Sequence, residues 1–192
     1  MKLTIGLFFG SFNPIHIGHM TIAEYIAEYS DINELWFVVS PQNPLKKQQN
    51  LLDDYQRLEL AHRAIGKDPR FRVSDIEFYM PKPSYTVDTL TYLSDKHPDY
   101  TFKMIMGADN LVSFQKWKNY ELLENKYTRL VYPRHGISKE EMKKHKNIEI
   151  VKAPKIEISS SFIRKAIKEG KKIRYFMPQA VYEYIDEMNF YR

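Results

Sequence analysis

The chain has 192 residues and a mass of 22.9 kDa, which fits one compact domain spanning residues 1–192. It contains no cysteine, and this excludes disulfide frameworks, thiolate zinc sites and cysteine nucleophiles. The formal net charge of +5 favours anionic partners, either nucleic acid or phosphorylated small molecules.

The amino-terminal segment has some features of a secretion signal, but its pattern is that of a buried strand. Residues 3–9 are almost continuously apolar, and Asn13 and Pro14 follow where a small-residue cleavage site would be needed. No apolar run approaches the roughly 18 residues that span a bilayer. We therefore expect a cytoplasmic protein without a membrane partner, which agrees with the absence of cysteine.

Apolar periodicity predicts strands that alternate with helices along the whole chain. In order, we expect a strand at residues 3–9, a helix at 18–29, a strand at 34–40, a helix at 54–65, a strand at 71–78, a helix at 86–97, strands at 100–106, 127–132 and 148–151, and helices at 160–169 and 178–188. This pattern predicts an α/β fold with a doubly wound parallel sheet in the strand order 3-2-1-4-5. The helical segment at about 160–192 is expected to pack on the same domain.

Residue types at two of the expected helix starts support these boundaries. Asp53 or Asp54 can cap the helix at 54–65, because a side-chain oxygen there accepts a hydrogen bond from a free backbone N–H. Ser160 or Ser161 can do the same for the helix at 160–169. Arg164 lies one turn after these serines and could add a forked cation to an anion bound there.

The expected strand order also predicts where a ligand binds. A doubly wound sheet binds its ligand beyond the carboxyl ends of the strands, where the strand order reverses. With the order 3-2-1-4-5, this point lies between the first and fourth strands. The loops at residues 10–19 and 107–109 follow those two strands, so we expect them to face each other across a crevice.

The loop at residues 10–19 has features suited to phosphate. The motifs G-x-G-x-x-G and G-x-x-x-x-G-K-[ST] are missing, which argues against a dinucleotide-binding dehydrogenase and a P-loop enzyme. Gly10 allows the backbone to approach a ligand closely. His16 and His19 lie three apart at a helix start, beside free N–H groups and the positive end of the helix dipole. Gly18 leaves room for an anion between these two imidazoles, which can donate hydrogen bonds or become cationic.

Two other interpretations of the histidine pair remain open at this stage. The pair could be half of a metal site, although no cysteine and no evident third ligand lie near it in the sequence. The histidines could also be structural, with their rings satisfied by backbone groups.

Two motifs at opposite ends of the chain resemble those of a known superfamily. The sequence Gly-Ser-Phe-Asn-Pro-Ile-His-Ile-Gly-His at residues 10–19 resembles the H-x-G-H signature of the nucleotidyltransferases. Residues 158–164, Ile-Ser-Ser-Ser-Phe-Ile-Arg, resemble the I-S-S-T-x-I-R signature of the same superfamily. Together they identify the chain as a member of that superfamily.

Further segments narrow the resemblance to the bacterial nicotinate mononucleotide adenylyltransferases. Residues 84–90 match the S-Y-T-x-D-T-L segment of that family, and residues 107–109 with 114–117 match its G-x-D and F-x-x-W elements. The chain departs from the family pattern at Phe9, where a second glycine is usual, and at Asn13, where aspartate is usual. The family loop P-P-H-K reads Asn-Pro-Leu-Lys at residues 43–46, so its histidine is replaced by Leu45.

The resemblance implies transfer of AMP from ATP to nicotinate mononucleotide in NAD biosynthesis, with ATP and this mononucleotide as partners. His16 and His19 would be the catalytic residues at the ATP phosphates. Mg²⁺ would arrive with ATP rather than bind in a protein site, and Asp109 would contact ribose or adenosine. The ATP-binding residues implied are Gly10, Ser11, Phe12, His16, Gly18, His19, Gly107, Asp109, Ser160, Ser161 and Arg164. The acceptor-binding residues implied are Lys46 and Arg134 for phosphate, backbone donors around Tyr85 and Thr86 for the pyridine carboxylate, and Trp117 for the ring.

Other functions are weaker alternatives on this sequence. Within the superfamily, the acceptor could be the amide mononucleotide or phosphopantetheine, and a few unplaced backbone donors decide between carboxylate and amide. A non-catalytic nucleotide-binding or RNA-binding module would need an exposed basic face with aromatic platforms. The aromatic residues are instead spread through the expected strands and helices, so no nucleic-acid partner is expected. Self-association of the chain is left open.

Overall fold

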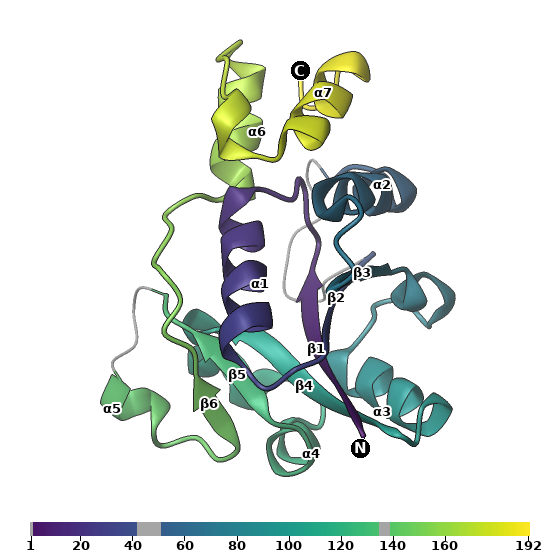
Figure 1. Ribbon diagram of the computed structural model, residues 1–192, viewed down its shortest axis with the longest axis vertical. Coiled ribbons are helices and arrows are strands. Elements are labelled where there is room, and N and C mark those ends of the chain that lie inside the picture. Colours follow the sequence, from purple (N-terminus) through teal and green to yellow (C-terminus); the bar gives the residue numbers. More distant parts are fainter. Residues whose placement is uncertain (1, 42–50, 135–138) are drawn as a thin grey trace.

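The protein is built around one six-stranded parallel sheet (Figure 1). The computed structural model describes residues 2–41, 51–134 and 139–192. The strands are β1 (Leu3–Gly10), β2 (Glu34–Val39), β3 (Phe71–Ser74), β4 (Tyr100–Gly107), β5 (Arg129–Tyr132) and β6 (Ile148–Ile150). Their spatial order is β3-β2-β1-β4-β5-β6, and every neighbouring pair is parallel. The predicted order 3-2-1-4-5 is confirmed, with β6 added beyond β5.

Helices cover both faces of this sheet, as a doubly wound fold requires. The longer helices are α1 (Ile17–Tyr29), α2 (Asp54–Ile65), α3 (Thr86–Lys96), α6 (Ser160–Lys168) and α7 (Gln179–Glu187). Buried side chains of α1, α2, α6 and α7 form one core with one face of the sheet. Buried side chains of α3 and of the segment between β4 and β5 form a second core with the other face. No helix in the described ranges is long and apolar enough to cross a membrane.

The two cores follow from the alternation of side chains along each strand. In β1, Ile5 and Leu7 point into the α3 core and Phe8 into the α1 core. Both kinds of side chain are apolar because both faces are covered, and this is why the strands read as continuous apolar runs.

One predicted strand is shorter than expected. The pattern at residues 71–78 predicts a single strand, but β3 ends at Ser74 and a 3₁₀ turn, η1 (Ile76–Tyr79), follows it. β3 pairs only with β2, and the last β2 residue in that pairing is Val38, opposite Ser74, one residue before β2 itself ends. The turn exposes Tyr79 and directs Glu77 inward.

Short helical elements were missed by the sequence analysis. They are η2 (Ala108–Lys116), α4 (Tyr120–Lys126), α5 (Lys139–Met142) and η3 (Arg174–Phe176). Each is a 3₁₀ segment or an α-helix of no more than two turns. Such a segment is too short to show a helical period in its apolar residues.

The predicted helix caps are correct at α2 and one residue off at α6. Asp53 caps α2 by accepting a hydrogen bond from the backbone N–H of Tyr55 at 2.9 Å. The cap of α6 is Ser159, which accepts from the N–H of Phe162 at 3.2 Å, rather than Ser160 or Ser161. The hydroxyl of Ser160 is therefore available for another partner.

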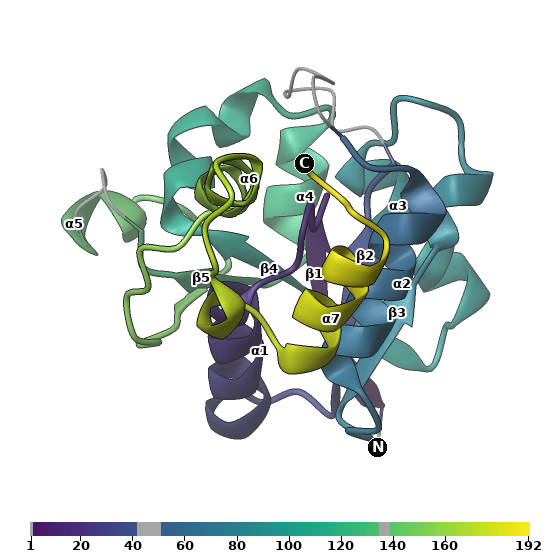
Figure 2. The same ribbon diagram turned by 90° about the horizontal axis from the view of Figure 1, so that it is seen from above.

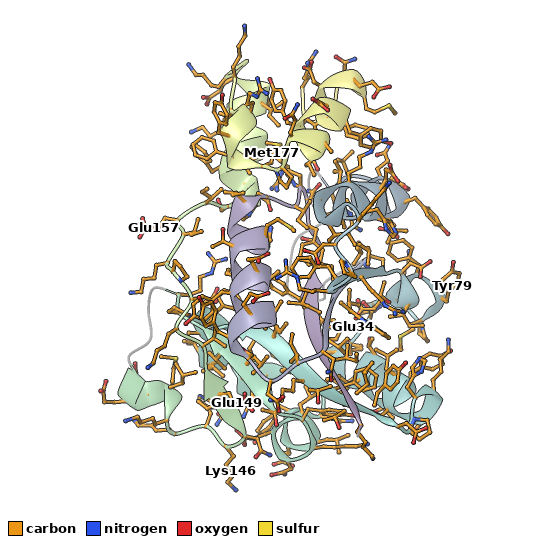
Figure 3. The ribbon with its side chains drawn as sticks, viewed as in Figure 1. Glu34, Tyr79, Lys146, Glu149, Glu157 and Met177 are labelled. Atoms are coloured by element: carbon orange, nitrogen blue, oxygen red, sulfur yellow. The ribbon has the colours of Figure 1, made fainter. Side chains whose placement is uncertain are left out.

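The carboxyl-terminal helices stand at the end of the molecule where α1 begins (Figures 1 and 2). Met177 is buried and lies between α6 and α7, whereas Tyr79 at the end of η1 is exposed at the edge of the molecule (Figure 3). This end of the molecule is also where the carboxyl end of β1 leads into α1, so the last helices pack beside the loop at residues 10–19.

Candidate active site

A cleft of about 710 Å³ opens at the carboxyl ends of β1 and β4, where the strand order reverses. Both loops that the topology singles out, 10–19 and 107–109, contribute to its walls. The residues predicted for the site that line this cleft are Gly10, Ser11, Phe12, His19, Tyr85, Thr86, Gly107, Asp109, Trp117, Arg134 and Ser160. One cleft therefore brings together segments from opposite ends of the chain.

The two histidines form a reciprocal cap at the start of α1. Nδ1 of His16 accepts a hydrogen bond from the backbone N–H of Gly18 at 3.1 Å, and Nδ1 of His19 accepts from the backbone N–H of His16 at 3.2 Å. The two rings lie 3.8 Å apart between centroids. Because each Nδ1 accepts a hydrogen bond, a neutral ring must carry its proton on Nε2. The backbone thus makes both Nε2 atoms hydrogen-bond donors.

The two rings differ in exposure. His16 is buried behind His19, and only His19 lines the cleft. Burial, with a smaller contribution from the charge of Arg134, lowers the pKa of His16 from 6.5 to about 4. The His16 imidazole is therefore neutral at pH 7. In the unliganded protein, positive charge at this end of the cleft comes from Arg134 and the helix start rather than from His16.

This geometry bears on the other interpretations of the pair. Among the described residues, no group of three or more histidine, cysteine or acidic side chains could hold a metal ion. The structural interpretation is right in that both Nδ1 atoms bond backbone N–H groups. That role involves only the Nδ1 atoms, so a capping role and a binding role do not exclude each other.

Two glycines of the site are required by close side-chain packing. A Cβ atom on Gly18 would lie 3.0 Å from the ring of His16, so a larger residue would displace that ring. A Cβ atom on Gly107 would collide with Oδ1 of Asp109. Glycine at these positions keeps His16 and Asp109 in place, and the expected room for an anion beside Gly18 stays a prediction.

Phe12 shapes the loop between β1 and α1 from inside the core. Its backbone is left-handed, with φ of +44°, and its side chain is 2% exposed. The ring packs edge-on against Phe8, Phe37 and His19, with centroids 5.2 to 5.8 Å away. A left-handed bulky residue costs of order 1 kcal/mol or more. Packing of the ring supports that conformation and thereby the path of the loop.

Helix α6 holds the same loop through hydrogen bonds to its carbonyl groups. The hydroxyl of Ser160 donates to the carbonyl of Pro14 at 2.9 Å, and Nη1 of Arg164 donates to the carbonyl of Asn13 at 2.7 Å. Ser161 is exposed and 3.4 Å from Nη2 of Arg164. The second signature therefore docks directly on the first, although 146 to 151 residues separate the bonded pairs.

Asn13 ties this loop to two further parts of the chain. Its Oδ1 accepts hydrogen bonds from the hydroxyl of Tyr191 at 2.7 Å and from the backbone N–H of Leu52 at 3.3 Å. Burial raises the pKa of Tyr191, so its hydroxyl keeps the proton that it donates. An aspartate at position 13 could accept the same two bonds, so the departure from the family pattern leaves this anchor intact.

The other end of the cleft is formed by the start of α3 and the end of η2. Tyr85 precedes the first turn of α3, whose start has no side-chain cap, so backbone donors at Thr86 remain available. Trp117 packs against Phe114 with ring centroids 5.5 Å apart and lines the cleft. Its indole Nε1 is buried and has no hydrogen-bond partner among the described residues.

Glu77 is a site residue that the sequence analysis missed. It is 2% exposed, lines the cleft, and accepts hydrogen bonds from the hydroxyls of Ser84 at 2.7 Å and Thr89 at 2.9 Å. Ser40 bonds the same carboxylate. Burial raises the pKa of Glu77 despite these three donors. The carboxylate thus joins the end of β2 to the residues on both sides of Thr86.

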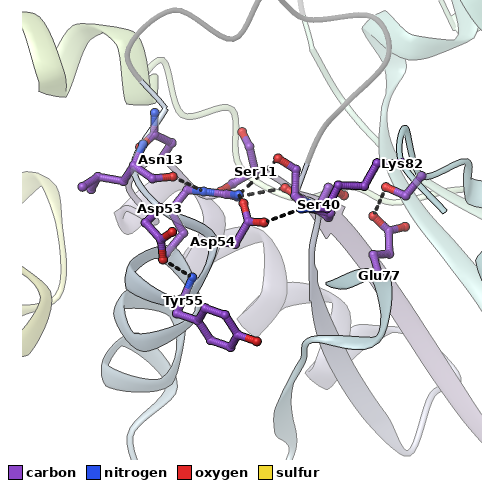
Figure 4. A network of polar contacts seen from close by, with 12 residues as sticks. Ser11, Asn13, Ser40, Asp53, Asp54, Tyr55, Glu77 and Lys82 are labelled. Carbon is purple, nitrogen blue, oxygen red and sulfur yellow. Dashed lines mark hydrogen bonds and ion pairs between the residues drawn. The ribbon is translucent and has the colours of Figure 1, made fainter. Parts of the chain in front are cut away.

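Arg57 is a second residue that the sequence analysis missed, and its side chain is fully buried. It donates hydrogen bonds to the carbonyls of Ser11 at 2.6 Å, Ser40 at 2.8 Å and Leu52 at 2.9 Å, and it pairs with Asp54 at 2.5 Å. Figure 4 shows this network, in which Ser11, Ser40 and Asp54 converge. Arg57 thereby connects the loops that follow β1 and β2 beneath the cleft.

Arg134 and Lys46 are the two residues predicted to bind the acceptor phosphate. Arg134 lies beside Gly107 and 5.5 Å from the Tyr132 ring centroid, and its charge influences His16, so it belongs to the histidine end of the cleft. Its predicted role towards the acceptor phosphate stays a prediction. Lys46, with the 43–46 loop, lies outside the described residues.

Comparison with known proteins identifies the fold and the protein family of this chain. The cytidylyltransferase-like family matches residues 7–166 of this chain. A structure of the nicotinic acid mononucleotide adenylyltransferase of Plasmodium falciparum, complexed with NaAD, has the same fold, with a TM-score of 0.85 and 24% sequence identity over 98% of this chain and 97% of that chain. The fold is therefore the one shared with that adenylyltransferase, and the family is the cytidylyltransferase-like family.

Closer relatives narrow the class. A probable nicotinate-nucleotide adenylyltransferase of Cytophaga hutchinsonii is 51% identical over 98% of both chains. A protein of the same name from Flavobacterium psychrophilum is 52% identical over 99% of this chain and 100% of its own length. The chain thus belongs to the cytidylyltransferase-like family and, within it, to the nicotinate-nucleotide adenylyltransferases. The resemblance noted in the sequence is confirmed.

Proposed function

We propose that this enzyme transfers AMP from ATP to nicotinate mononucleotide, with release of pyrophosphate. The observation that carries the proposal is a single cleft that joins the histidine-capped start of α1 to Thr86 and Trp117. The first end suits a triphosphate and the second suits an aromatic ring with an acidic substituent. Relatives of about 50% identity that bear the corresponding name support the same reaction.

The reaction needs alignment and charge stabilisation more than it needs a protein nucleophile. A phosphate oxygen of the mononucleotide forms a bond to the α-phosphorus of ATP, and the bond from that phosphorus to the bridging oxygen of pyrophosphate breaks. The attacking group is already an anion, so no general base is required. Catalysis then rests on holding the two substrates in line and on stabilising charge as it moves to the leaving pyrophosphate.

The histidine end of the cleft would perform that stabilisation. His19 lines the cleft and carries its proton on Nε2, and the positive end of the α1 dipole and the cation of Arg134 lie at the same end. His16 would support His19 through contact between the two rings and through its backbone N–H. ATP would enter as its Mg²⁺ complex, with the ion held by phosphate oxygens and water.

The far end of the cleft would bind the acceptor base. Backbone N–H groups at the start of α3 can donate to a pyridine carboxylate, and the face of Trp117 can stack on the ring. Glu77 would hold this subsite together through Ser84 and Thr89. Both substrates are free nucleotides, so we propose a cytoplasmic enzyme that requires no nucleic acid.

Replacing Trp117 with alanine is expected to raise the KM for nicotinate mononucleotide by about tenfold, since base–aromatic stacking contributes about 1–3 kcal/mol. The KM for ATP should change little, because Trp117 lies at the other end of the cleft from His19. Initial rates with each substrate varied in turn would measure both constants. An effect confined to ATP would show that the ring assignment is wrong.

Replacing Arg164 with alanine is expected to raise the KM for ATP by about tenfold, because a charge-assisted hydrogen bond to the 10–19 loop contributes about 1.5–3 kcal/mol. Arg164→Lys should recover part of the loss, since lysine keeps the charge but not the fork. An unchanged KM for ATP in Arg164→Ala would show that Arg164 does not contribute to ATP binding.

A pyrophosphate-release assay tests the proposed function. ATP and Mg²⁺ would be supplied with nicotinate mononucleotide, its amide or phosphopantetheine, and we expect the highest kcat/KM with the first. Faster turnover of phosphopantetheine would assign the enzyme to another acceptor class. No turnover of any acceptor would favour a non-catalytic nucleotide-binding protein.

A further inference from the structure

An ion pair connects the two segments that form the acceptor end of the cleft. Nζ of Lys118 lies 2.8 Å from Oδ2 and 3.1 Å from Oδ1 of Asp88. Lys118 directly follows Trp117, and Asp88 lies in the first turn of α3, two residues after Thr86. The pair therefore connects the segment of Trp117, which we assign to the pyridine ring, with the start of α3, which we assign to the carboxylate of that ring.

The lysine of this pair faces the cleft. Lys118 lines it together with Tyr85, and its Nζ lies 4.7 Å from the centroid of the Tyr85 ring. Asp88 is not among the lining residues. The two side chains are 43% and 41% exposed, so water screens the pair and its energy is modest. A ligand carboxylate at the start of α3 would nevertheless be close to a cation that the protein holds in place.

Among the lysines near this end of the cleft, Lys118 is the one that both lines the cleft and is held by an ion pair. Lys116 also lines the cleft, but no ion pair with another described residue fixes its position. Lys82 is 3.1 Å from Asp54, so it is engaged with the Arg57 network instead. Glu77 lines the cleft with a carboxyl group that burial makes harder to ionise. Asp88 adds a negative charge in the first turn of α3, and Lys118 pairs with it.

We propose that Lys118 determines the preference of this enzyme for an acceptor base that bears a carboxylate over one that bears an amide. Two effects follow from the geometry. The lysine attracts the carboxylate of the acid, and it cancels the repulsion that Asp88 would exert on that carboxylate. The amide is uncharged and experiences neither effect. The inference rests on the proposed function, since it concerns which pyridine mononucleotide the same cleft accepts.

The test compares kcat/KM for nicotinate mononucleotide and for its amide in the unmodified enzyme and in variants. Lys118→Gln leaves Asp88 without its partner, and the acid-to-amide ratio should fall about threefold to fivefold, the range of a half-exposed charge pair. Lys118→Arg keeps the cation and should keep the ratio. The double variant Lys118→Gln with Asp88→Asn removes both charges and should recover part of the loss.

Two controls separate this electrostatic role from a structural one. Lys165→Gln removes an exposed lysine that pairs with Glu169 on α6, and the ratio should not change. Raising the ionic strength should lower the ratio in the unmodified enzyme but not in Lys118→Gln, because salt screens exposed charges. A merely structural loss would reduce both substrates equally and leave the ratio unchanged.

The possible outcomes distinguish this inference from the proposed function. An unchanged ratio in Lys118→Gln, in an enzyme that still uses nicotinate mononucleotide, would overturn the inference and leave the proposed function standing. If the unmodified enzyme used neither pyridine mononucleotide, both would be overturned. A lower ratio in Lys118→Gln that the double variant partly restores would support the assignment.

Discussion

Replacing His19 with alanine is expected to lower kcat for AMP transfer by about 100-fold to 1000-fold, the effect of removing one well-placed donor to a developing negative charge. His19 is the histidine of the pair that lines the cleft, and the backbone N–H of His16 fixes its tautomer with the proton on Nε2. Alanine removes that donor and leaves the start of α1 without one of its two caps. The pyrophosphate-release rate at saturating substrates would measure the effect.

The fold should survive this substitution. His19 is only half-buried, and loss of a cap costs about 1 kcal/mol, so the melting temperature should fall by a few degrees. His62→Ala provides a matched control, because His62 is exposed on α2 and should leave kcat unchanged. A near-normal kcat in His19→Ala would show that His19 has no catalytic role.

Replacing Arg57 with alanine is expected to destabilise the protein by about 3–5 kcal/mol, the usual cost of breaking a buried ion pair by removing one partner. The guanidinium is fully buried, and its loss removes the donor to the carbonyls of Ser11 and Ser40 and leaves Asp54 with its ion pair to Lys82 alone. Urea denaturation followed by circular dichroism would measure the free energy of unfolding.

A surface arginine provides the comparison for Arg57. Arg72 pairs with Glu34 but is 62% exposed, so Arg72→Ala should cost about 1 kcal/mol or less. Arg57→Lys should be intermediate, because lysine keeps the charge but cannot reach the three carbonyls with one fork. Equal costs for Arg57→Ala and Arg72→Ala would contradict the role assigned to Arg57.

The sheet could be predicted from the sequence because buried parallel strands carry a strong local signal. The expected strands are short segments rich in apolar residues, and helical crossovers between parallel strands leave few topologies. The exception is residues 71–78, where the apolar pattern continues past Ser74, the last residue of β3 that pairs with β2. A local pattern contains no information about where pairing with a neighbouring strand ends.

The histidine pair could be found in the sequence, but its geometry could not. The bonds from Gly18 to His16 and from His16 to His19 depend on backbone angles at the helix start. They show that the structural and functional interpretations of the pair are compatible. The low pKa of His16 also depends on burial, which the residue types around it do not reveal.

Arg57 and Glu77 were missed for a different physical reason. The partners of Arg57 are mostly backbone carbonyls, including that of Ser11, which lies 46 residues away in the chain. Carbonyl groups are present at every position, so no residue pattern marks them as partners. Glu77 lies in a segment predicted as a strand, and the 3₁₀ turn that buries it became visible only in the structure.

An isotope-transfer experiment tests the central claim most directly. Nicotinate mononucleotide with oxygen-18 at every non-bridging phosphate oxygen would be incubated with ATP, Mg²⁺ and the enzyme, and both products would be examined by mass spectrometry. Attack of this phosphate on the α-phosphorus of ATP predicts a dinucleotide that retains all of the label and a pyrophosphate that has none. Label in the pyrophosphate, or a reaction that forms no dinucleotide, would contradict the account.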